Sequence, residues 1–308
     1  MPHGEPHGLS GDGWEGTRAG PVQDDPAQGW PTRGRGMDVR TLYDEHPINE
    51  EEVLSKLVAA GKDIAALQPE DLLTYDQDHY GGTEATDVLA QRLALAPGQR
   101  VLDVCAGLGG SSRYLAWKYD CTVTGVELTA SRVSGAQALT RRVGLQERVT
   151  IVQGDATRLE LEPAGFDAAV SQESFLHITD KAALLGGIRR MLRAGGRLGF
   201  TDWTATPRLT AEERRELRER IAAYDVIEPA QYAAHLGHAG FRDLAHEDLS
   251  PLWAKILRAR LEMYRSLEAE TVRRFGRARH EHYMAAYETF VAAVEAGRLG
   301  GGRFLAIA

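Results

Sequence analysis

The chain has 308 residues, a formal net charge of −8 and two cysteines. Its length suffices for one large α/β domain with an inserted helical segment, whereas the acidic balance argues against a nucleic-acid partner, because a general nucleic-acid binder needs a basic face. The sequence has no apolar run of membrane-spanning length, no signal-peptide pattern and no metal-ligand cluster. We therefore expect a cytoplasmic protein without membrane association or a bound metal.

The N-terminal region changes character near Met37. Residues 1–36 are rich in Gly, Pro and Asp and have no apolar periodicity, so we expect a disordered N-terminal extension. Ordered patterning begins shortly after Met37, and we expect the folded domain to span 37–308. Met37 is itself an alternative start of the protein, and the sequence leaves the two starts open.

Two helices are expected between residues 49 and 95, ahead of the first strand. Asn49 is a typical N-cap, with Glu52 at the third position, and Gly61 ends this first helix. Gly82 leads into the second helix, whose apolar residues have helical spacing.

A strand followed by a glycine-rich turn occupies residues 101–110. The strand, the turn and the helix that begins near Ser111 would place unpaired backbone N–H groups beside the carboxyl edge of a sheet, where α/β proteins bind nucleotides. The next strand, 122–126, ends in Glu127, roughly twenty residues after the glycines. A carboxylate at that distance can accept both hydroxyls of a ribose.

The details of the turn favour S-adenosyl-L-methionine over a dinucleotide. A dinucleotide site has a third glycine where this chain has Ser112, which disfavours a dinucleotide-dependent oxidoreductase. Asp103, just before the turn, suits a ligand that presents an ammonium group and no pyrophosphate. A glycine-rich turn that binds nothing is the alternative.

Regular alternation of strands and helices predicts a parallel sheet. Strands are expected near Val101, Val123, Val149, Ala168 and Leu198, with helices near Arg113, Val133 and Leu184 between them. Cys105 and Cys121 fall in predicted strands without Cys-x-x-Cys spacing, so we expect both to be reduced. A further helix is expected over 211–224, a sixth strand over 241–246 and a seventh over 304–307. A helical insertion, 252–298, separates the last two strands.

Residues 80–203 resemble a class I S-adenosylmethionine-dependent methyltransferase. Asp155 and Ala156, after the strand 149–153, match the family's adenine-contacting acidic motif, while 167–172 and 192–198 match its fourth strand and the turn before the fifth. The resemblance implies a Rossmann-like seven-stranded sheet whose last strand is antiparallel, with N-terminal helices that cover the cofactor. Cys105 and Ala194 depart from the pattern, which usually has Gly and Pro there.

Two further motifs resemble the sarcosine and dimethylglycine N-methyltransferases. These are S-Q-E-S-F-L-H at 171–177 and F-T-D at 200–202, and the helical insertion before the last strand is similar too. The resemblance implies a small-molecule substrate, with the nitrogen of an amino acid or amine as the favoured acceptor. The subgroup also contains O- and C-methylating enzymes of secondary metabolites, and a cofactor-binding protein without catalysis is the alternative of another class.

The candidate site residues follow from the motifs and the resemblance. Cofactor contacts are expected from Tyr80, Asp103, Ala106, Gly107, Gly109, Glu127, Leu128, Asp155, Ala156 and Gln172. Tyr80 resembles the family's cofactor-lid tyrosine, with packing on the first helix as the alternative.

On the acceptor side, His177 is the candidate for the group that takes the amine's proton, because its ordinary pKa lies near neutrality. Anchoring of a loop is the equal alternative for His177. Glu173 would hold a cationic amine or face solvent. Phe175, Asp202 and Trp203 are expected to contact substrate, and Trp203 could instead pack in the core. A homodimer is left open.

Overall fold

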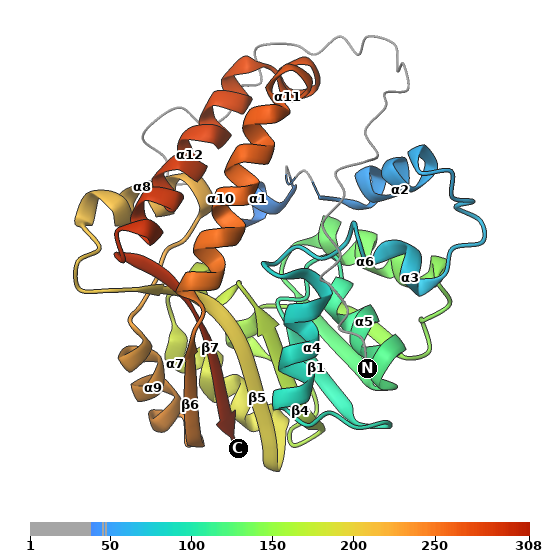
Figure 1. Ribbon diagram of the computed structural model, residues 1–308. Helices are drawn as coiled ribbons and strands as arrows, with labels where there is room; N and C mark the ends of the chain where they lie inside the picture. Colours follow the sequence, from blue (N-terminus) through green and yellow to red (C-terminus); the bar gives the residue numbers. More distant parts are fainter. Residues whose placement is uncertain (1–37, 45, 47) are drawn as a thin grey trace, which may run out of the picture.

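The computed structural model describes residues 38–44, 46 and 48–308; the expected N-terminal extension lies outside them. In this part of the chain seven strands form one sheet in the order β3-β2-β1-β4-β5-β7-β6 (Figure 1). The strands are β1 (Arg100–Val104), β2 (Thr122–Glu127), β3 (Val149–Gln153), β4 (Phe166–Gln172), β5 (Leu192–Ala205), β6 (Arg242–Asp248) and β7 (Leu299–Ile307).

Strand pairing gives the sheet one edge where the parallel strands end. Neighbours among β1 to β5 pair in parallel, and β7 pairs antiparallel with both β5 and β6. This confirms the expected seven-stranded sheet with an antiparallel last strand. The carboxyl ends of β1, β2 and β4 therefore lie at the same edge, which is where such sheets bind ligands.

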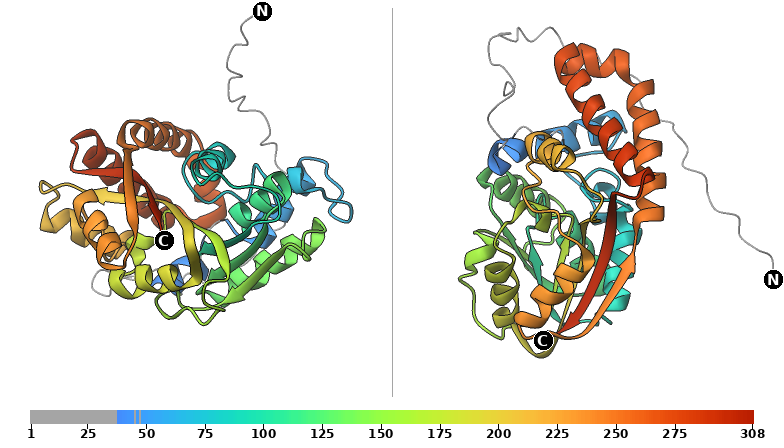
Figure 2. Two further views of the ribbon diagram at one scale, coloured as in Figure 1. Left: turned by 90° about the horizontal axis from the view of Figure 1, so that it is seen from below. Right: turned by 90° about the vertical axis from the view of Figure 1, so that its left-hand side faces the viewer.

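Helices cover both faces of the sheet, as the views in Figure 2 show. They are α1 (Val39–Asp44), α2 (Glu50–Ala59), α3 (Pro69–Leu72), α4 (Gly82–Arg92), α5 (Gly110–Tyr119), α6 (Ala130–Arg142), α7 (Lys181–Met191), α8 (Ala211–Ile221), α9 (Pro229–His238), α10 (Ser250–Ser266), α11 (Glu268–Phe275) and α12 (Arg277–Glu295), with 3₁₀ turns η1 (Ala156–Arg158) and η2 (Phe175–His177).

Alternate residues of each strand face two different hydrophobic cores, as the two-residue period of a strand requires. Val101 and Ala168 pack toward α4, α5 and α6, whereas Leu102 and Ala169 pack toward α7 and α9. Helix α9 is absent from the sequence prediction, as are the short helices α1 and α3.

The helical insertion between β6 and β7 stands above the carboxyl edge of the sheet (Figure 1). Together with α8 it builds a third core around Trp203, Trp253 and Phe290, which are all buried. The helices of the insertion are interrupted at Leu267 and at Gly276. Gly276 has a φ of 82°, a positive value that glycine adopts readily. We call α8, α10 and α12 the roof.

The last strand begins earlier than expected, at Leu299 rather than at residue 304. Two of its glycines are required by the close packing of α10. A Cβ on Gly300 would lie 2.1 Å from Ser250 Oγ, and one on Gly301 would lie 2.4 Å from the Trp253 ring. Glycine inside a strand commonly marks such an approach.

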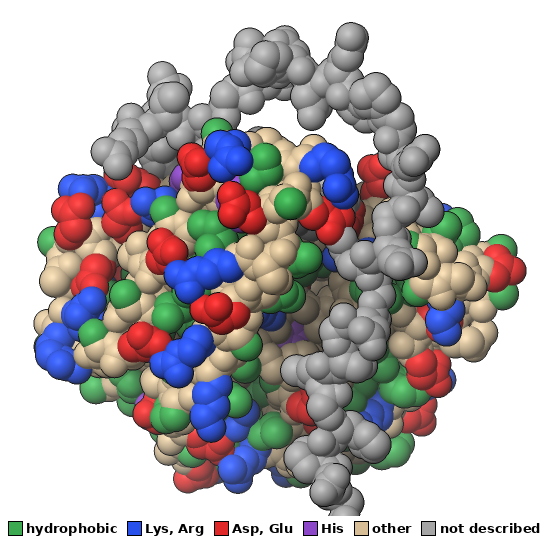
Figure 3. Space-filling model, turned by 45° about the horizontal axis from the view of Figure 1, so that its top comes forward, with side chains coloured by type: hydrophobic (Ala, Val, Ile, Leu, Met, Phe, Trp, Pro, Cys, Tyr) green, Lys and Arg blue, Asp and Glu red, His purple; other side chains and the backbone are tan. Residues whose placement is uncertain are grey.

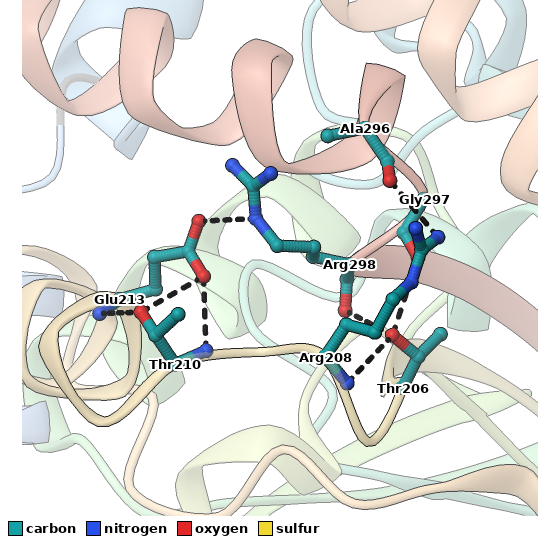
Figure 4. Close-up of polar contacts among 7 residues, drawn as sticks. All are labelled: Thr206, Arg208, Thr210, Glu213, Ala296, Gly297 and Arg298. Atoms are coloured by element: carbon teal, nitrogen blue, oxygen red, sulfur yellow. Dashed lines mark hydrogen bonds and ion pairs between the residues drawn. The ribbon is translucent and has the colours of Figure 1, made fainter.

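Polar contacts join the loop after β5 to the end of α12 (Figure 4). Arg298 donates to Glu213 over 2.7 Å, and Glu213 also accepts from the Thr210 N–H at the start of α8. Arg208 donates to the Ala296 and Gly297 carbonyls at 3.0 and 2.8 Å. These contacts connect the start of α8 to the residues that follow α12, and they stabilise the arrangement of the roof helices.

Acidic and basic side chains are interspersed on the face shown in Figure 3. On the roof many of them pair with each other. Arg265 of α10, for example, lies 2.8 Å from Glu262 and 3.0 Å from Glu288 of α12. Exposed pairs of this kind contribute about 0–1 kcal/mol each.

Candidate active site

Two adjoining cavities lie at the carboxyl edge of the sheet. The loop cavity, of about 140 Å³, is bordered by the glycine-rich turn and by the ends of β1, β2 and β4. The roof cavity, of about 200 Å³, lies beneath α8, α10 and α12. Tyr43, Asp78, Glu173 and His177 line both cavities, so these four residues form the junction between them.

Most of the expected cofactor contacts line the loop cavity. They are Asp103, Ala106, Gly107, Glu127, Leu128, Asp155, Ala156 and Gln172. Gly109 is the N-cap of α5 with a φ of 75° and shapes the turn without lining the cavity. Tyr80 lines the roof cavity instead.

Backbone N–H groups hold the Glu127 carboxylate in place. One oxygen accepts from the Gly107 N–H at 3.0 Å and the other from the Thr129 N–H at 2.8 Å. A carboxylate has about four acceptor positions, so positions remain for two hydroxyls. This arrangement fits the ribose of S-adenosyl-L-methionine.

Asp103 lies in the wall of the same cavity and is almost fully buried. Burial raises its pKa to about 6, and a hydrogen bond from Ser112 Oγ at 2.5 Å acts in the opposite direction. A ligand ammonium would stabilise the ionised carboxylate. The residues of the loop cavity therefore fit both the ribose and the ammonium group of the expected cofactor.

Cys105 lies in the turn after β1 rather than in the expected strand, and Cys121 directly precedes β2. Cys105 has a φ of 63°, a conformation that glycine adopts without strain. This explains why the methyltransferase pattern usually has glycine there. Both cysteines are free thiols.

Gln172 belongs to a hydrogen-bond network with His79. Its Oε1 accepts from Ser111 Oγ at 2.7 Å and from Thr86 Oγ1 at 3.1 Å, and its Nε2 lies 3.2 Å from His79 Nδ1. Burial lowers the pKa of His79 to about 4, so the network is uncharged at neutral pH. It holds the segment before α4 against the glycine-rich turn.

Glu173 is placed at the junction by an unusual backbone conformation. Its φ is 56°, its N–H donates to the Thr201 carbonyl at 2.7 Å, and its carboxylate accepts from the Tyr80 N–H at 2.8 Å. Burial raises the pKa of this carboxyl to about 8. Glu173 can therefore exchange a proton near neutral pH.

His177 and Tyr43 form a hydrogen-bonded pair at the same junction. His177 Nδ1 lies 3.0 Å from the Ala222 carbonyl, so this nitrogen must carry the proton, and Nε2 accepts from the Tyr43 hydroxyl at 3.1 Å. Burial lowers the pKa of His177 to about 4. Burial, followed by the charge of Asp78, raises the pKa of the Tyr43 phenol. The sequence analysis missed Tyr43.

The roof cavity combines aromatic side chains with the half-buried Arg260. Its lining includes Tyr80, Trp203, Tyr264, Tyr283, Tyr287 and Phe290. The Arg260 guanidinium lies 4.7 Å above the centre of the Tyr80 ring and donates to the His79 carbonyl at 3.4 Å. Among the ion pairs of the described residues, none involves Arg260.

Two expected substrate contacts lie outside both cavities. Phe175 packs against Phe200 in the core beneath α7 and α9, with ring centres 4.8 Å apart. Asp202 is fully buried and accepts a 2.5 Å hydrogen bond from Tyr232. Asp202 points away from the roof because successive residues of a strand face opposite sides of the sheet, and its neighbour Trp203 faces the roof. We therefore do not propose either residue as a substrate contact.

The described residues contain no cluster of three or more His, Cys, Asp or Glu side chains arranged to hold a metal ion. None of their helices combines the length and apolar character needed to cross a membrane.

Comparisons with known proteins agree with this geometry. The family model described as "Methyltransferase domain" matches residues 101–196. Phosphoethanolamine N-methyltransferase 3 of Arabidopsis thaliana is 30% identical over 226 residues, which are 73% of this chain and 46% of the plant protein. The chain thus spans less than half of that relative. Glycine/sarcosine/dimethylglycine N-methyltransferase of Actinopolyspora halophila is 29% identical over 70% of the chain and 38% of its own length.

A third relative and one solved structure are covered more fully. The 27-O-demethylrifamycin SV methyltransferase of Amycolatopsis mediterranei is 30% identical over 68% of this chain and 78% of its own length. Phosphoethanolamine N-methyltransferase 2 of Haemonchus contortus, solved with phosphomonomethylethanolamine and S-adenosylhomocysteine, superposes with a TM-score of 0.71 at 21% identity. The superposition covers 88% of this chain and 60% of that structure. The chain belongs to the class I S-adenosylmethionine-dependent methyltransferases, and it is related to those that methylate the nitrogen of small molecules.

Proposed function

We propose that the chain methylates the nitrogen of a small amine that also carries an anionic group, such as a carboxylate or a phosphate. The observation that carries the proposal is that carboxyl groups and a guanidinium line the same roof cavity. Glu173 and Asp78 lie at the junction with the loop cavity, and Arg260 lies among the aromatic residues beneath the roof. A zwitterionic acceptor would satisfy both kinds of charge.

The junction residues have the chemistry that amine methylation needs. S-Adenosyl-L-methionine supplies an activated methyl group on a sulfonium. In an in-line displacement the methyl–sulfur bond breaks as the nitrogen lone pair forms a new bond to the methyl carbon, so the ammonium must first lose a proton. The Glu173 carboxylate can take that proton, because its raised pKa brings it closer to that of an amine.

Tyr43 and His177 would orient the nitrogen. The Tyr43 hydroxyl donates to His177 Nε2, which leaves its oxygen lone pairs free to accept an N–H of a primary or secondary amine. This leaves the nitrogen lone pair directed at the methyl group. His177 thus acts through Tyr43 in our proposal, rather than as the direct base that the sequence suggested.

The comparisons support an acceptor of this kind. The relatives at 29–30% identity include enzymes named for phosphoethanolamine and for glycine, sarcosine and dimethylglycine. Each of these acceptors carries an amine nitrogen and an anion a few bonds apart. Trp203, in the wall of the roof cavity, would add a cation–π contact to a methylated ammonium, worth about 0.5–2 kcal/mol.

A second candidate function is O- or C-methylation of a larger metabolite. The aromatic lining contributed by Tyr264, Tyr283, Tyr287 and Phe290 favours it, because such surfaces bind apolar rings. The match to 27-O-demethylrifamycin SV methyltransferase over 78% of that protein points the same way.

The test is formation of S-adenosylhomocysteine with mass detection of the methylated product. The panel contains glycine, sarcosine, dimethylglycine, ethanolamine phosphate, unmodified ethanolamine, and several phenols and sugars. We expect methylation at nitrogen, with the anionic amines favoured over ethanolamine. Methylation confined to phenols or sugars would replace the proposal by the second candidate. Tight cofactor binding without turnover of any acceptor would favour the alternative of a cofactor-binding protein without catalysis.

Arg260 provides a variant test of the anion. Arg260→Met should raise KM for ethanolamine phosphate and sarcosine about 10- to 100-fold, the value of one charge-assisted contact of roughly 1.5–3 kcal/mol. Arg260→Lys is the matched control, because it keeps the positive charge. An equal rise in KM for unmodified ethanolamine would contradict a role in anion binding.

The cytoplasmic location, the possible homodimer and the lack of a nucleic-acid partner stay predictions from the sequence. Size-exclusion chromatography with light scattering measures the oligomeric state directly.

A further inference from the structure

Arg132, in the first turn of α6, is a buried arginine that the proposed chemistry does not use. Its exposed fraction is 1%. Its Nη2 donates to Asp78 at 2.7 Å, its Nη1 donates to the Ile48 carbonyl, and its guanidinium carbon lies 5.2 Å above the centre of the Tyr43 ring.

These contacts come from separate parts of the chain. Tyr43 belongs to α1, Ile48 follows α1, and Asp78 lies in the segment before α4. We call α1 with His46 and Ile48 the N-terminal cap. A second contact, from Ser131 Oγ to Asp44 at 2.5 Å, joins the cap to the same end of α6. One turn of α6 therefore holds the cap over the junction of the two cavities.

Arg132 and the N-terminal cap stabilise each other. Burial of an unpaired guanidinium costs several kcal/mol, and here Asp78, the Ile48 carbonyl and the Tyr43 ring offset that cost. Helix α1 has six residues, and even Tyr43 is only partly buried by solvent exposure, so the helix has little packing of its own. The position of Tyr43 thus depends on contacts from outside α1.

A neighbouring arginine shows what a purely structural role looks like. Arg113 of α5 is also buried and pairs with Asp76 at 2.8 Å. Its other partners are the Ala136 carbonyl and Thr140 Oγ1, both on α6. None of its hydrogen bonds reaches the N-terminal cap, so Arg113 is the matched control.

We propose that Arg132 is a positioning residue for methyl transfer, which fixes the Tyr43 hydroxyl on His177 at the junction of the cavities. The proposal rests on the proposed function only for the role of Tyr43 in turnover. The closure of the cap by Arg132 can be measured without any acceptor.

The activity test is a double-mutant cycle. Arg132→Gln should lower kcat about 10- to 100-fold in the wild-type background. In the Tyr43→Phe background the same substitution should lower kcat less than about threefold, because residues that act through one another are not additive. Arg113→Gln should have the same effect in both backgrounds. Equal effects of Arg132→Gln in both backgrounds would overturn the proposal.

The acceptor-free test is hydrogen exchange of peptides covering residues 38–48. Arg132→Gln should speed exchange there about tenfold or more, while peptides from β1 and α5 keep their protection. Unchanged exchange in 38–48 would overturn the proposal even if no acceptor is found. Arg132→Lys, which keeps the charge beside Asp78, should give a smaller change in both tests, and it carries the same comparison if Arg132→Gln does not fold.

Discussion

The pH dependence of turnover follows from the burial of Glu173. Its folded-state pKa of about 8 arises first from burial; the Tyr80 N–H and the Arg260 charge lower it, and Asp202 and Asp78 raise it. A carboxyl with this pKa is about one-tenth ionised at pH 7 and about nine-tenths ionised at pH 9. If the ionised form takes the amine's proton, kcat/KM should rise about tenfold between these two values.

Glu173→Gln should remove that rise. A glutamine keeps an oxygen for the Tyr80 N–H, which Glu173 accepts at 2.8 Å, so the local backbone contact survives. At pH 9 we expect a loss of about 10- to 100-fold in kcat/KM, equivalent to one charge-assisted hydrogen bond of roughly 1.5–3 kcal/mol. Initial rates of S-adenosylhomocysteine formation from pH 6 to 10 measure both effects.

The acceptor's own ionisation must be separated from that of Glu173. We would repeat the pH profile with two acceptors whose amines differ in pKa. If the rise in kcat/KM reflects ionisation of the acceptor, its midpoint shifts with the pKa of the amine. If the rise reflects Glu173, its midpoint stays the same. The sign of the stability effect gives a second check. A folded-state pKa above the unfolded value makes ionised Glu173 destabilising, so stability falls as pH rises from 4.5 to 8, and Glu173→Gln should raise Tm at pH 8. A pH limb that persists in Glu173→Gln would refute the reasoning.

Three further outcomes are expected. Glu127→Gln should weaken the binding of S-adenosylhomocysteine about 10- to 100-fold, as measured by calorimetry. An amide nitrogen cannot accept the backbone N–H that one carboxylate oxygen of Glu127 accepts. An unchanged Kd would contradict this expectation. Gly125→Ala should lower stability in urea by about 1–3 kcal/mol, because its Cβ would lie 2.5 Å from a β3 side chain, whereas Gly186→Ala, with open space around it, should not. His79 and His177 have pKa values lowered to about 4, so each should lower the free energy of unfolding by about 1.4 kcal/mol for every pH unit of decrease between pH 6.5 and 4. Because buried carboxyls such as Glu173 act in the opposite direction over this range, the effect is measured as the difference between the wild type and His177→Gln. Equal pH slopes in the two proteins would contradict the burial of His177 as a neutral ring.

The sheet and the loop cavity were predictable because their signals are local. The strand, the glycine-rich turn and Glu127 lie within 27 residues of sequence, 101–127, and the rule that parallel strands share one carboxyl edge brings them together. Asp155 follows the next strand in the same way. For these residues, chain order and strand direction suffice to place the side chain.

The acceptor side was harder to predict because it depends on tertiary contacts. Tyr43 lies on a helix of six residues, all of them at least partly exposed, and so short a helix shows no apolar periodicity. Arg132 and Arg260 lie on helices that carry further arginines, and an arginine usually faces solvent. How far each side chain is covered depends on which face of its helix the other elements pack against.

The remaining difference between the prediction and the structure concerns which side of the sheet the residues at the end of β5 face. The sequence indicated the end of β5 and its approach to the active edge, but not which of two adjacent residues faces the cavity. Trp203 lines the roof cavity and Asp202 points to the opposite core, since a shift of one residue reverses the face of a strand.

The most direct test of the account is a crystal structure with S-adenosylhomocysteine and the acceptor that the panel identifies. We expect the ribose on Glu127 in the loop cavity, the sulfur directed toward the junction at Glu173, and the acceptor in the roof cavity with its nitrogen beside Tyr43. An acceptor bound elsewhere, or one whose nitrogen lies away from Glu173 and Tyr43, would contradict it.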